Sequence, residues 1–115
     1  MTEPTALIVT ASHTASYAKA IDASMGETLS VGPEDIDFPG WVWCTSVAGV
    51  SSWVPIAYLE IDGESGRLKR DYNAMELSVE VGQRLTRIDE VSGWYLCETE
   101  SHQRGWAPME NIRAL

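Results

Sequence analysis

The chain repeats itself, and this internal repeat limits its possible folds more than any other feature of the sequence. A shift of 53 residues aligns residues 40–59 with residues 93–112. The identities in this alignment are Gly40 with Gly93, Trp41 with Trp94, Cys44 with Cys97, Trp53 with Trp106, and Pro55 with Pro108. One duplication therefore accounts for four of the five tryptophans, and it predicts two copies of one structural unit.

Upstream of these tryptophans the alignment continues with a shift of 56 residues, which pairs Gly26 with Gly82 and Leu29 with Leu85. The first copy thus carries three extra residues before its shared tryptophan, inside the segment "GPEDIDFPG". The two copies are expected to differ most in this loop.

Each copy is rich in β signals. Short runs of aromatic and β-branched residues follow Gly or Ser, and Gly or Pro interrupts every stretch that could form a long helix. The expected strands cover residues 27–31, 41–46 and 51–56 in the first copy, and residues 84–88, 94–99 and 104–109 in the second. The sequence predicts an all-β fold with one domain at 1–61, a short linker "DGESG" at 62–66, and a second domain at 67–115.

The charge pattern limits the kinds of partner that the chain can bind. The net charge is −9, and Lys19 is the single basic residue of residues 1–61. In the second half, the basic residues Arg67, Lys69 and Arg70 are followed at once by Asp71. A nucleic-acid partner is therefore not expected, because such proteins present a basic face to the phosphates.

The N-terminal segment "MTEPTALIVTAS" has neither a basic start nor an apolar run long enough for a signal peptide or a membrane span. We therefore expect no membrane association and a cytoplasmic location.

The two cysteines, Cys44 and Cys97, occupy the same position of the repeat. They cannot form a disulfide framework, and they are not spaced as metal ligands. Strand alternation places Cys44 on the face of Val42 and Cys97 on that of Tyr95. Both thiols are predicted to be small buried core residues, and no metal or cofactor is expected.

Catalysis is not expected. A Cys–His nucleophile would need a thiol beside an imidazole. His102 instead lies in a loop between two expected strands, Cys97 is expected to point into the core, and His13 has no place in the repeat. No glycine-rich phosphate loop appears either.

The ordered motifs resemble those of SH3 domains, and in particular the tandem variant SH3 proteins of bacteria. The second copy, "RDYNAMELSVEVGQRLTRIDEVSGWYLCETESHQRGWAPMENI", carries the clearer match, and the first copy matches through "MGETLSV", "PGWVWC" and "SSWVPIAYL". The resemblance implies two SH3-like small barrels in tandem, the first with a divergent first strand and RT loop.

SH3 domains recognise proline-rich segments between flat aromatic walls, with acidic loops for a flanking basic residue. In the second copy, this resemblance assigns the peptide-binding groove to Tyr72, Trp94, Pro108 and Asn111, with acidic loop residues Glu76, Asp89 and Glu90. Arg70 stands where the family has its first groove tyrosine, and Asn111 where it has its last.

In the first copy, the resemblance assigns the groove to Trp41, Pro55 and Tyr58, with acidic loop residues Glu34, Asp35 and Asp37. Ala11 and His13 align with the two tyrosines of the family's first motif. Neither groove has its complete set of aromatic residues.

Two residues depart from the pattern. Arg87 occupies a position equivalent to Val31, which is normally apolar and inward-facing, so it is expected to reach solvent or to meet an acid. Trp43 is the tryptophan outside the repeat, and it shares a strand face with Trp41. Widening a binding surface and packing against the neighbouring module are both open to it.

Two functions remain open from the sequence. The protein is either a non-catalytic interaction module that binds a peptide, proline-containing and basic, through its aromatic and acidic grooves, or a structural or assembly protein. In the second case, contacts between the domains or in a dimer cover the grooves. Self-association is therefore also open.

Overall fold

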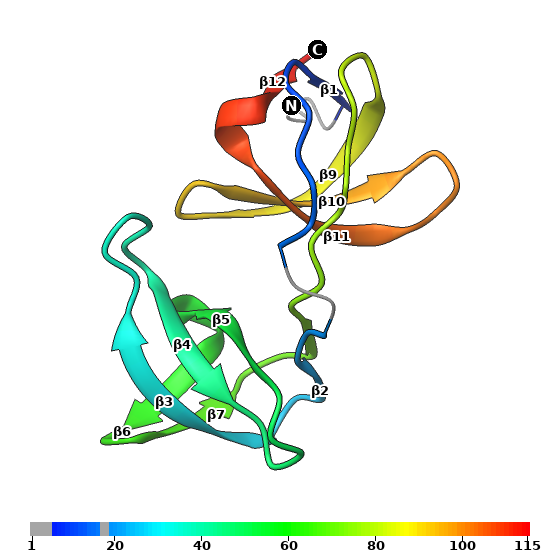
Figure 1. Ribbon diagram of the computed structural model, residues 1–115. Coiled ribbons are helices and arrows are strands. Elements are labelled where there is room, and N and C mark those ends of the chain that lie inside the picture. The colour runs from blue at the N-terminus through cyan, green and yellow to red at the C-terminus, as the bar shows by residue number, and fades with distance from the viewer. Residues whose placement is uncertain (1–5, 17–18) are drawn as a thin grey trace, which may run out of the picture. The chain divides into compact units, whose positions relative to one another are not determined.

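The computed structural model of the protein describes residues 6–16 and 19–115, and the described chain is all-β (Figure 1). Its strands form two five-stranded antiparallel sheets and one two-stranded pair. The all-β prediction is confirmed. In the described part of the chain both larger sheets are open and neither closes into a barrel. No helix in that part is long and apolar enough to cross a membrane.

The chain divides into two compact units. Unit 1 combines residues 6–16 with residues 76–115. Its sheet has the strand order β11-β10-β9-β1-β12 (Figure 1). The elements are β1 (Ala6–Val9), β9 (Arg84–Val91), β10 (Trp94–Thr99), β11 (Arg104–Pro108), the 3-10 turn η2 (Met109–Asn111) and β12 (Ile112–Ala114).

Unit 2 is formed by residues 19–75 of the described chain. Its sheet has the order β5-β4-β3-β7-β6, and β2 pairs separately with β8. The elements are β2 (Asp22–Ala23), β3 (Thr28–Glu34), β4 (Trp41–Thr45), β5 (Ser51–Pro55), the 3-10 turn η1 (Ile56–Tyr58), β6 (Leu59–Asp62), β7 (Ser65–Leu68) and β8 (Tyr72–Asn73).

Equivalent turns in the two units carry the duplicated glycines. Gly26 and Gly82 have φ angles of 92° and 88°, and Gly40 and Gly93 have φ angles of 104° and 93°. A side chain is strained in this left-handed region, so the turns retain glycine in both copies. The predicted duplication therefore extends to the backbone, and the six strands expected from it are all present.

The division into units differs from the expected boundaries at 1–61 and 67–115. Strand β1 lies between β9 and β12, which belong to the second copy of the repeat. Strand β7 lies between β3 and β6, which belong to the first copy. Each copy of the repeat therefore receives its N-terminal strand from the other copy's stretch of sequence.

Residues 62–66, expected as a linker, are part of a β-hairpin. Asp62 and Ser65 are register partners at the end of β6 and β7, and Gly63 between them has a φ of 62°. A glycine at the first central position is typical of a two-residue type II′ hairpin turn. The short "DGES" segment thus folds back on its own unit, and this keeps β7 in unit 2.

The core of unit 1 is apolar and contains Cys97. Eight buried residues contribute to it: Leu7, Val9, Leu77, Val79, Leu85, Cys97, Ala107 and Ile112. In unit 2 the equivalent Cys44 is likewise fully buried. Burial raises the pKa of the Cys97 thiol to about 12 and that of Cys44 to about 11. The prediction that both cysteines are buried core residues is confirmed.

The prediction for Arg87 is also confirmed. Its guanidinium donates a hydrogen bond to Glu90 at 3.2 Å, and its side chain is 22% exposed. The charge therefore meets an acid and solvent instead of lying unpaired in the core.

Candidate functional site

The candidate site residues of each unit lie where a segment from one copy of the repeat meets strands of the other. We call residues 6–16 the N-terminal arm and residues 65–75 the central arm. Val9 of the first arm is the register partner of Ile112, and Leu68 of the second is the partner of the equivalent Leu59. By the same spacing, His13 in unit 1 corresponds to Tyr72 in unit 2.

In unit 2 the central arm brings Tyr72 to the residues expected of the first groove. The Tyr72 ring lies edge-to-face against Tyr58, with 5.7 Å between ring centroids. Its hydroxyl donates a hydrogen bond of 2.7 Å to the backbone carbonyl of Trp53. The guanidinium of Arg70 stacks 4.2 Å from the centroid of the Tyr58 ring, as in a cation–π contact.

Trp41 and Pro55 are cross-strand partners in β4 and β5, directly before the turn that carries Tyr58. We call Trp41, Pro55, Tyr58, Arg70 and Tyr72 the tyrosine cluster. Trp41 is 5% exposed, and Tyr58 and Tyr72 are each 4% exposed. Tyr72, assigned from the sequence to the same groove as Trp94, instead belongs to this cluster.

In unit 1 the N-terminal arm supplies the equivalent contacts with polar groups. The His13 ring lies edge-to-face against Trp94, with 5.7 Å between centroids. The Nε2 atom of His13 is 2.9 Å from Oε1 of Glu76, and the same oxygen accepts a hydrogen bond from the backbone N–H of Ser16. The arm is thus fixed to the carboxylate by two contacts.

The remaining expected residues of this groove also lie at the arm. Trp94 and Pro108 are cross-strand partners in β10 and β11. The Asn111 amide donates a hydrogen bond of 3.0 Å to the backbone carbonyl of Ser12. We call His13, Glu76, Trp94, Pro108 and Asn111 the histidine cluster. Unlike Trp41, Trp94 is partly exposed.

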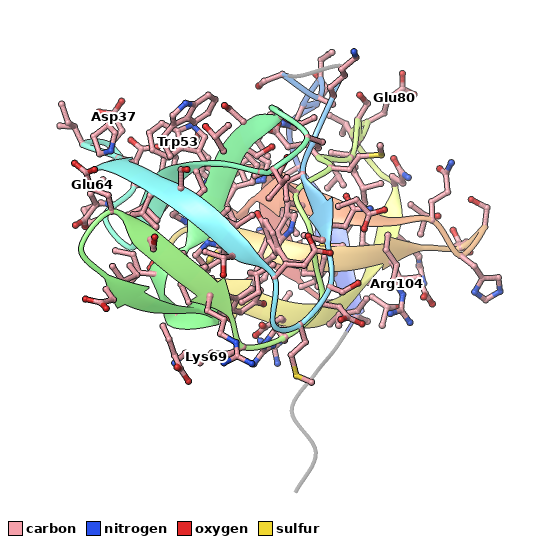
Figure 2. All side chains as sticks on the ribbon, turned by 90° about the horizontal axis from the view of Figure 1, so that it is seen from below. Asp37, Trp53, Glu64, Lys69, Glu80 and Arg104 are labelled. Carbon is pink, nitrogen blue, oxygen red and sulfur yellow. The ribbon has the colours of Figure 1, made fainter. Side chains whose placement is uncertain are left out.

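Two of the acids expected in the loop of the first groove hold that loop together. Glu34 accepts a hydrogen bond from the backbone N–H of Gly40. Asp35 accepts hydrogen bonds from the backbone N–H groups of Asp37 and Phe38, which is the pattern of an Asx turn. Asp37 itself is exposed in this loop (Figure 2).

The acids expected near Trp94 lie on the strand that pairs with it. Glu90 is the register partner of Tyr95, and Asp89 that of Leu96. The Glu90 carboxylate bonds to Arg87, whereas Asp89 accepts a hydrogen bond from the backbone N–H of Glu90. Both carboxylates therefore bond to groups of their own strand, β9, which is paired with the strand of Trp94.

Trp43 packs on its own sheet. It is the cross-strand partner of Trp53, and the two indoles meet edge-to-face with 5.0 Å between centroids. Trp43 is partly exposed. The two indoles therefore lie on the same face of the sheet of unit 2, across β4 and β5.

Among the contacts that sequence reasoning missed are those of Arg70 with Tyr58 and of Glu76 with His13. Arg70 and His13 were each noted as replacements for a groove tyrosine. Their partners lie in the other copy of the repeat, so an alignment of the copies could not pair them.

Outside this cluster, Glu98 of unit 1 is paired with two residues near the surface. The Arg104 guanidinium donates to Glu98 at 2.9 Å, and His102 Nδ1 lies 3.5 Å from the same carboxylate (Figure 2 labels Arg104). These hydrogen bonds, first that of Arg104 and then that of His102, lower the pKa of Glu98. Among residues 6–16 and 19–115, no group of three or more His, Cys, Asp or Glu side chains is arranged to hold a metal ion.

Comparisons with protein-family models, with curated proteins and with solved structures found no match to this chain. The functional argument therefore depends on the geometry of the two clusters.

Proposed function

We propose that the protein is a non-catalytic interaction module of two SH3-like units, in which the histidine cluster of unit 1 binds a basic, proline-containing peptide. One observation carries this proposal: Trp94 is partly exposed beside Pro108 and His13, whereas the equivalent Trp41 is only 5% exposed. A peptide proline needs an accessible aromatic face to pack against.

The SH3-like assignment is supported by the order of elements in unit 1. The first strand lies between the second and the last, and a 3-10 turn follows the strand that ends at Pro108. Trp94 begins β10 directly after the tight turn at Ser92 and Gly93. These are the places in which the resemblance puts the tryptophan and the proline of a ligand groove.

Charge supports a basic ligand. The chain has a net charge of −9, and Glu90 lies on the strand paired with Trp94's own strand. The Glu90 carboxylate bonds to Arg87, and because its side chain is 47% exposed, it is also accessible to a lysine or arginine of a bound peptide. Such contacts at an exposed rim act more on the association rate than on the affinity.

The state of the two thiols argues against catalysis by cysteine. A catalytic thiol has a depressed pKa and is accessible, whereas Cys44 and Cys97 are both fully buried and their pKa values are raised.

The tyrosine cluster favours a second role, a structural one, for unit 2. Its three aromatic side chains are at most 5% exposed, and the rings of Tyr58 and Tyr72 contact each other. Such packing stabilises a unit and leaves little aromatic surface for a ligand. In this proposal unit 2 is the structural half of the protein and unit 1 is the half that binds.

An array of synthetic proline-containing peptides, with and without a flanking arginine, tests the proposal. The full-length protein is expected to bind a subset of the arginine-containing peptides. Trp94→Ala should reduce that binding at least tenfold while the chain stays folded. Glu60→Gln, an exposed change in unit 2, serves as the matched control and should not alter binding. Absence of binding to every peptide, or binding unaffected by Trp94→Ala, would contradict the proposal.

A further inference from the structure

Each unit contains a slot for one strand between two others. In unit 1 the slot between β9 and β12 holds β1, and in unit 2 the slot between β3 and β6 holds β7. Leu7 faces Leu85 in the first slot, and Gly66 faces the equivalent Leu29 in the second. Because the slots are copies of one another, the chain has two ways to fill them.

In the alternative arrangement β1 would enter the slot of unit 2, and β7 would enter that of unit 1. Each copy of the repeat would then close on its own N-terminal strand, as the boundaries 1–61 and 67–115 predict. We call this the self-closed arrangement, and the observed one the exchanged arrangement. Backbone hydrogen bonds do not distinguish the two, so side chains must do so.

The side chain at the centre of each strand fits one slot only. A Cβ atom placed on Gly66 would lie 2.8 Å from Cγ2 of Val31 and 3.3 Å from Cδ2 of Leu59. The slot of unit 2 therefore has no room for the side chain of Leu7, and inserting it would overpack the core.

The slot of unit 1 has the opposite requirement. Leu7 is 1% exposed there and is part of the apolar core. A glycine in its place would leave a cavity of nearly a leucine side chain. At the position equivalent to Val31, unit 1 has Arg87, whose guanidinium bonds to Glu90 at a half-buried to exposed site. In unit 1, the large side chain of Leu7 on the inserted strand thus occurs together with Arg87, whose charged end lies outside the core.

We propose that the two slots are selective strand-binding sites, and that side-chain volume selects the strand in each. Leu7 together with Arg87 directs β1 to unit 1. Gly66 together with Val31 directs β7 to unit 2. The partner that fits the slot of unit 1 is a strand with a large apolar residue opposite Leu85. The slot of unit 2 takes only a strand with glycine at that position. This inference does not depend on peptide binding.

Cross-linking in the full-length protein tests which strand occupies each slot. Ala6 faces Thr86 in the exchanged arrangement, and it would face Ser30 in the self-closed one, because Ser65 faces Ser30 now. All three positions are exposed. An Ala6→Cys/Thr86→Cys pair should therefore cross-link on mild oxidation, and an Ala6→Cys/Ser30→Cys pair should not.

Exchanging the leucine and the glycine between the two strands should reverse which cysteine pair cross-links. In a Leu7→Gly/Gly66→Leu background, the 6/30 pair should cross-link and the 6/86 pair should lose most of its cross-linking. Unchanged preference for 6/86 in this background would overturn the proposal, as would equal cross-linking of both pairs in the native background. A 6/86 cross-link between two chains would support it, because β1 then still fills the slot of unit 1.

A double-mutant cycle with smaller substitutions tests the proposal if the Leu7→Gly/Gly66→Leu variant does not fold. Gly66→Ala should lower the urea midpoint of unit 2, and prior Val31→Ala should remove at least half of that loss because it deletes the clashing methyl group. Losses that simply add in the double variant would overturn the proposal.

Discussion

The tyrosine cluster and the histidine cluster occupy equivalent positions of a duplicated unit, yet they are built from different chemistry. Unit 2 places Tyr58 and Tyr72 ring against ring and covers Tyr58 with Arg70. Unit 1 has Asn111 and His13 at the positions of those two tyrosines, and holds them with hydrogen bonds. The tryptophan of the first cluster is buried, and that of the second is partly exposed.

This difference is the basis of the proposed division of roles between the two units. Rings packed on rings bury their aromatic surface and stabilise the unit. Smaller polar side chains leave part of the neighbouring tryptophan uncovered, and their hydrogen bonds still fix the arm. The first two predictions test this division of roles, and the next two test how alike the cores are and how little an exposed pair contributes.

Trp41→Ala should destabilise unit 2 by about 3–5 kcal/mol, the usual cost of removing a buried tryptophan. Trp94→Ala in unit 1 should cost less than half as much, because part of that indole is already in water. Urea unfolding of the two full-length variants measures both values. Equal losses would show that the two tryptophans have the same structural role, and the comparison would fail.

Tyr72→Phe should destabilise unit 2 by about 1–2 kcal/mol, since the Trp53 carbonyl loses its hydroxyl donor in a partly buried site. The ring contact with Tyr58 is retained in this variant, so the hydrogen bond is tested alone. Tyr95→Phe is the matched control in unit 1, and it should have a smaller effect. A neutral Tyr72→Phe would mean that water replaces the hydroxyl at that carbonyl.

The cysteines should make both units less stable at alkaline pH. Their folded-state pKa values are raised from 9.0 to about 11 and about 12, so the stabilisation is complete below pH 9 and is lost as pH rises through that interval. The loss at pH 10 should be on the order of 1 kcal/mol for each cysteine. Comparing unfolding of the native chain with Cys44→Ala and Cys97→Ala between pH 8 and pH 10 isolates it. A difference that does not change with pH would contradict the raised values.

The smallest effect is expected at the exposed pair of Arg104 and Glu98. Hydrogen bonding to Arg104 is the first cause of the lowered pKa of Glu98. The pKa of this carboxyl should therefore rise toward its ordinary value in Arg104→Ala, as followed by NMR titration. Any stabilisation from the pair is present above the ordinary pKa of a glutamate and is lost as pH falls. An unchanged titration would show that the pair does not form in solution.

Much of each unit could be predicted because the repeat is visible in the sequence. The shared glycines and tryptophans located the turns and six strands, and strand alternation placed Cys44 and Cys97 in the core. The contact of Arg87 with an acid could also be predicted, because burying an unpaired charge is costly.

The exchange of strands could not be predicted from the repeat, because equivalent strands fit equivalent slots in any pairing of the copies. The physical signal was the difference in volume between Leu7 and Gly66, which has meaning only when the neighbouring Val31 and Leu59 are known. The hairpin at Gly63 did carry a local signal. A glycine after Asp62 between two strands favours a two-residue turn, and a tight turn there precludes a linker.

Most residues of the two clusters were named from the sequence as groove residues, whereas Arg70 and His13 were noted only as replacements for groove tyrosines, and the grouping was not predicted. Tyr72 and Trp94 were expected in one groove because they belong to the same copy. In the structure Tyr72 contacts Tyr58, and Trp94 contacts His13 from the N-terminal arm. The assignment of these residues to clusters depends on which arm fills which unit.

The position of the N-terminal arm is therefore the quantity to measure first. Cross-strand nuclear Overhauser effects in the unmodified full-length protein report it directly. The account predicts contacts of Ala6 with Thr86 and of Leu7 with Leu85 and Ala114. Contacts of Ala6 with Ser30 and of Leu7 with Leu29 and Ile61 would instead place the arm in the first copy of the repeat, and would contradict the account of both clusters.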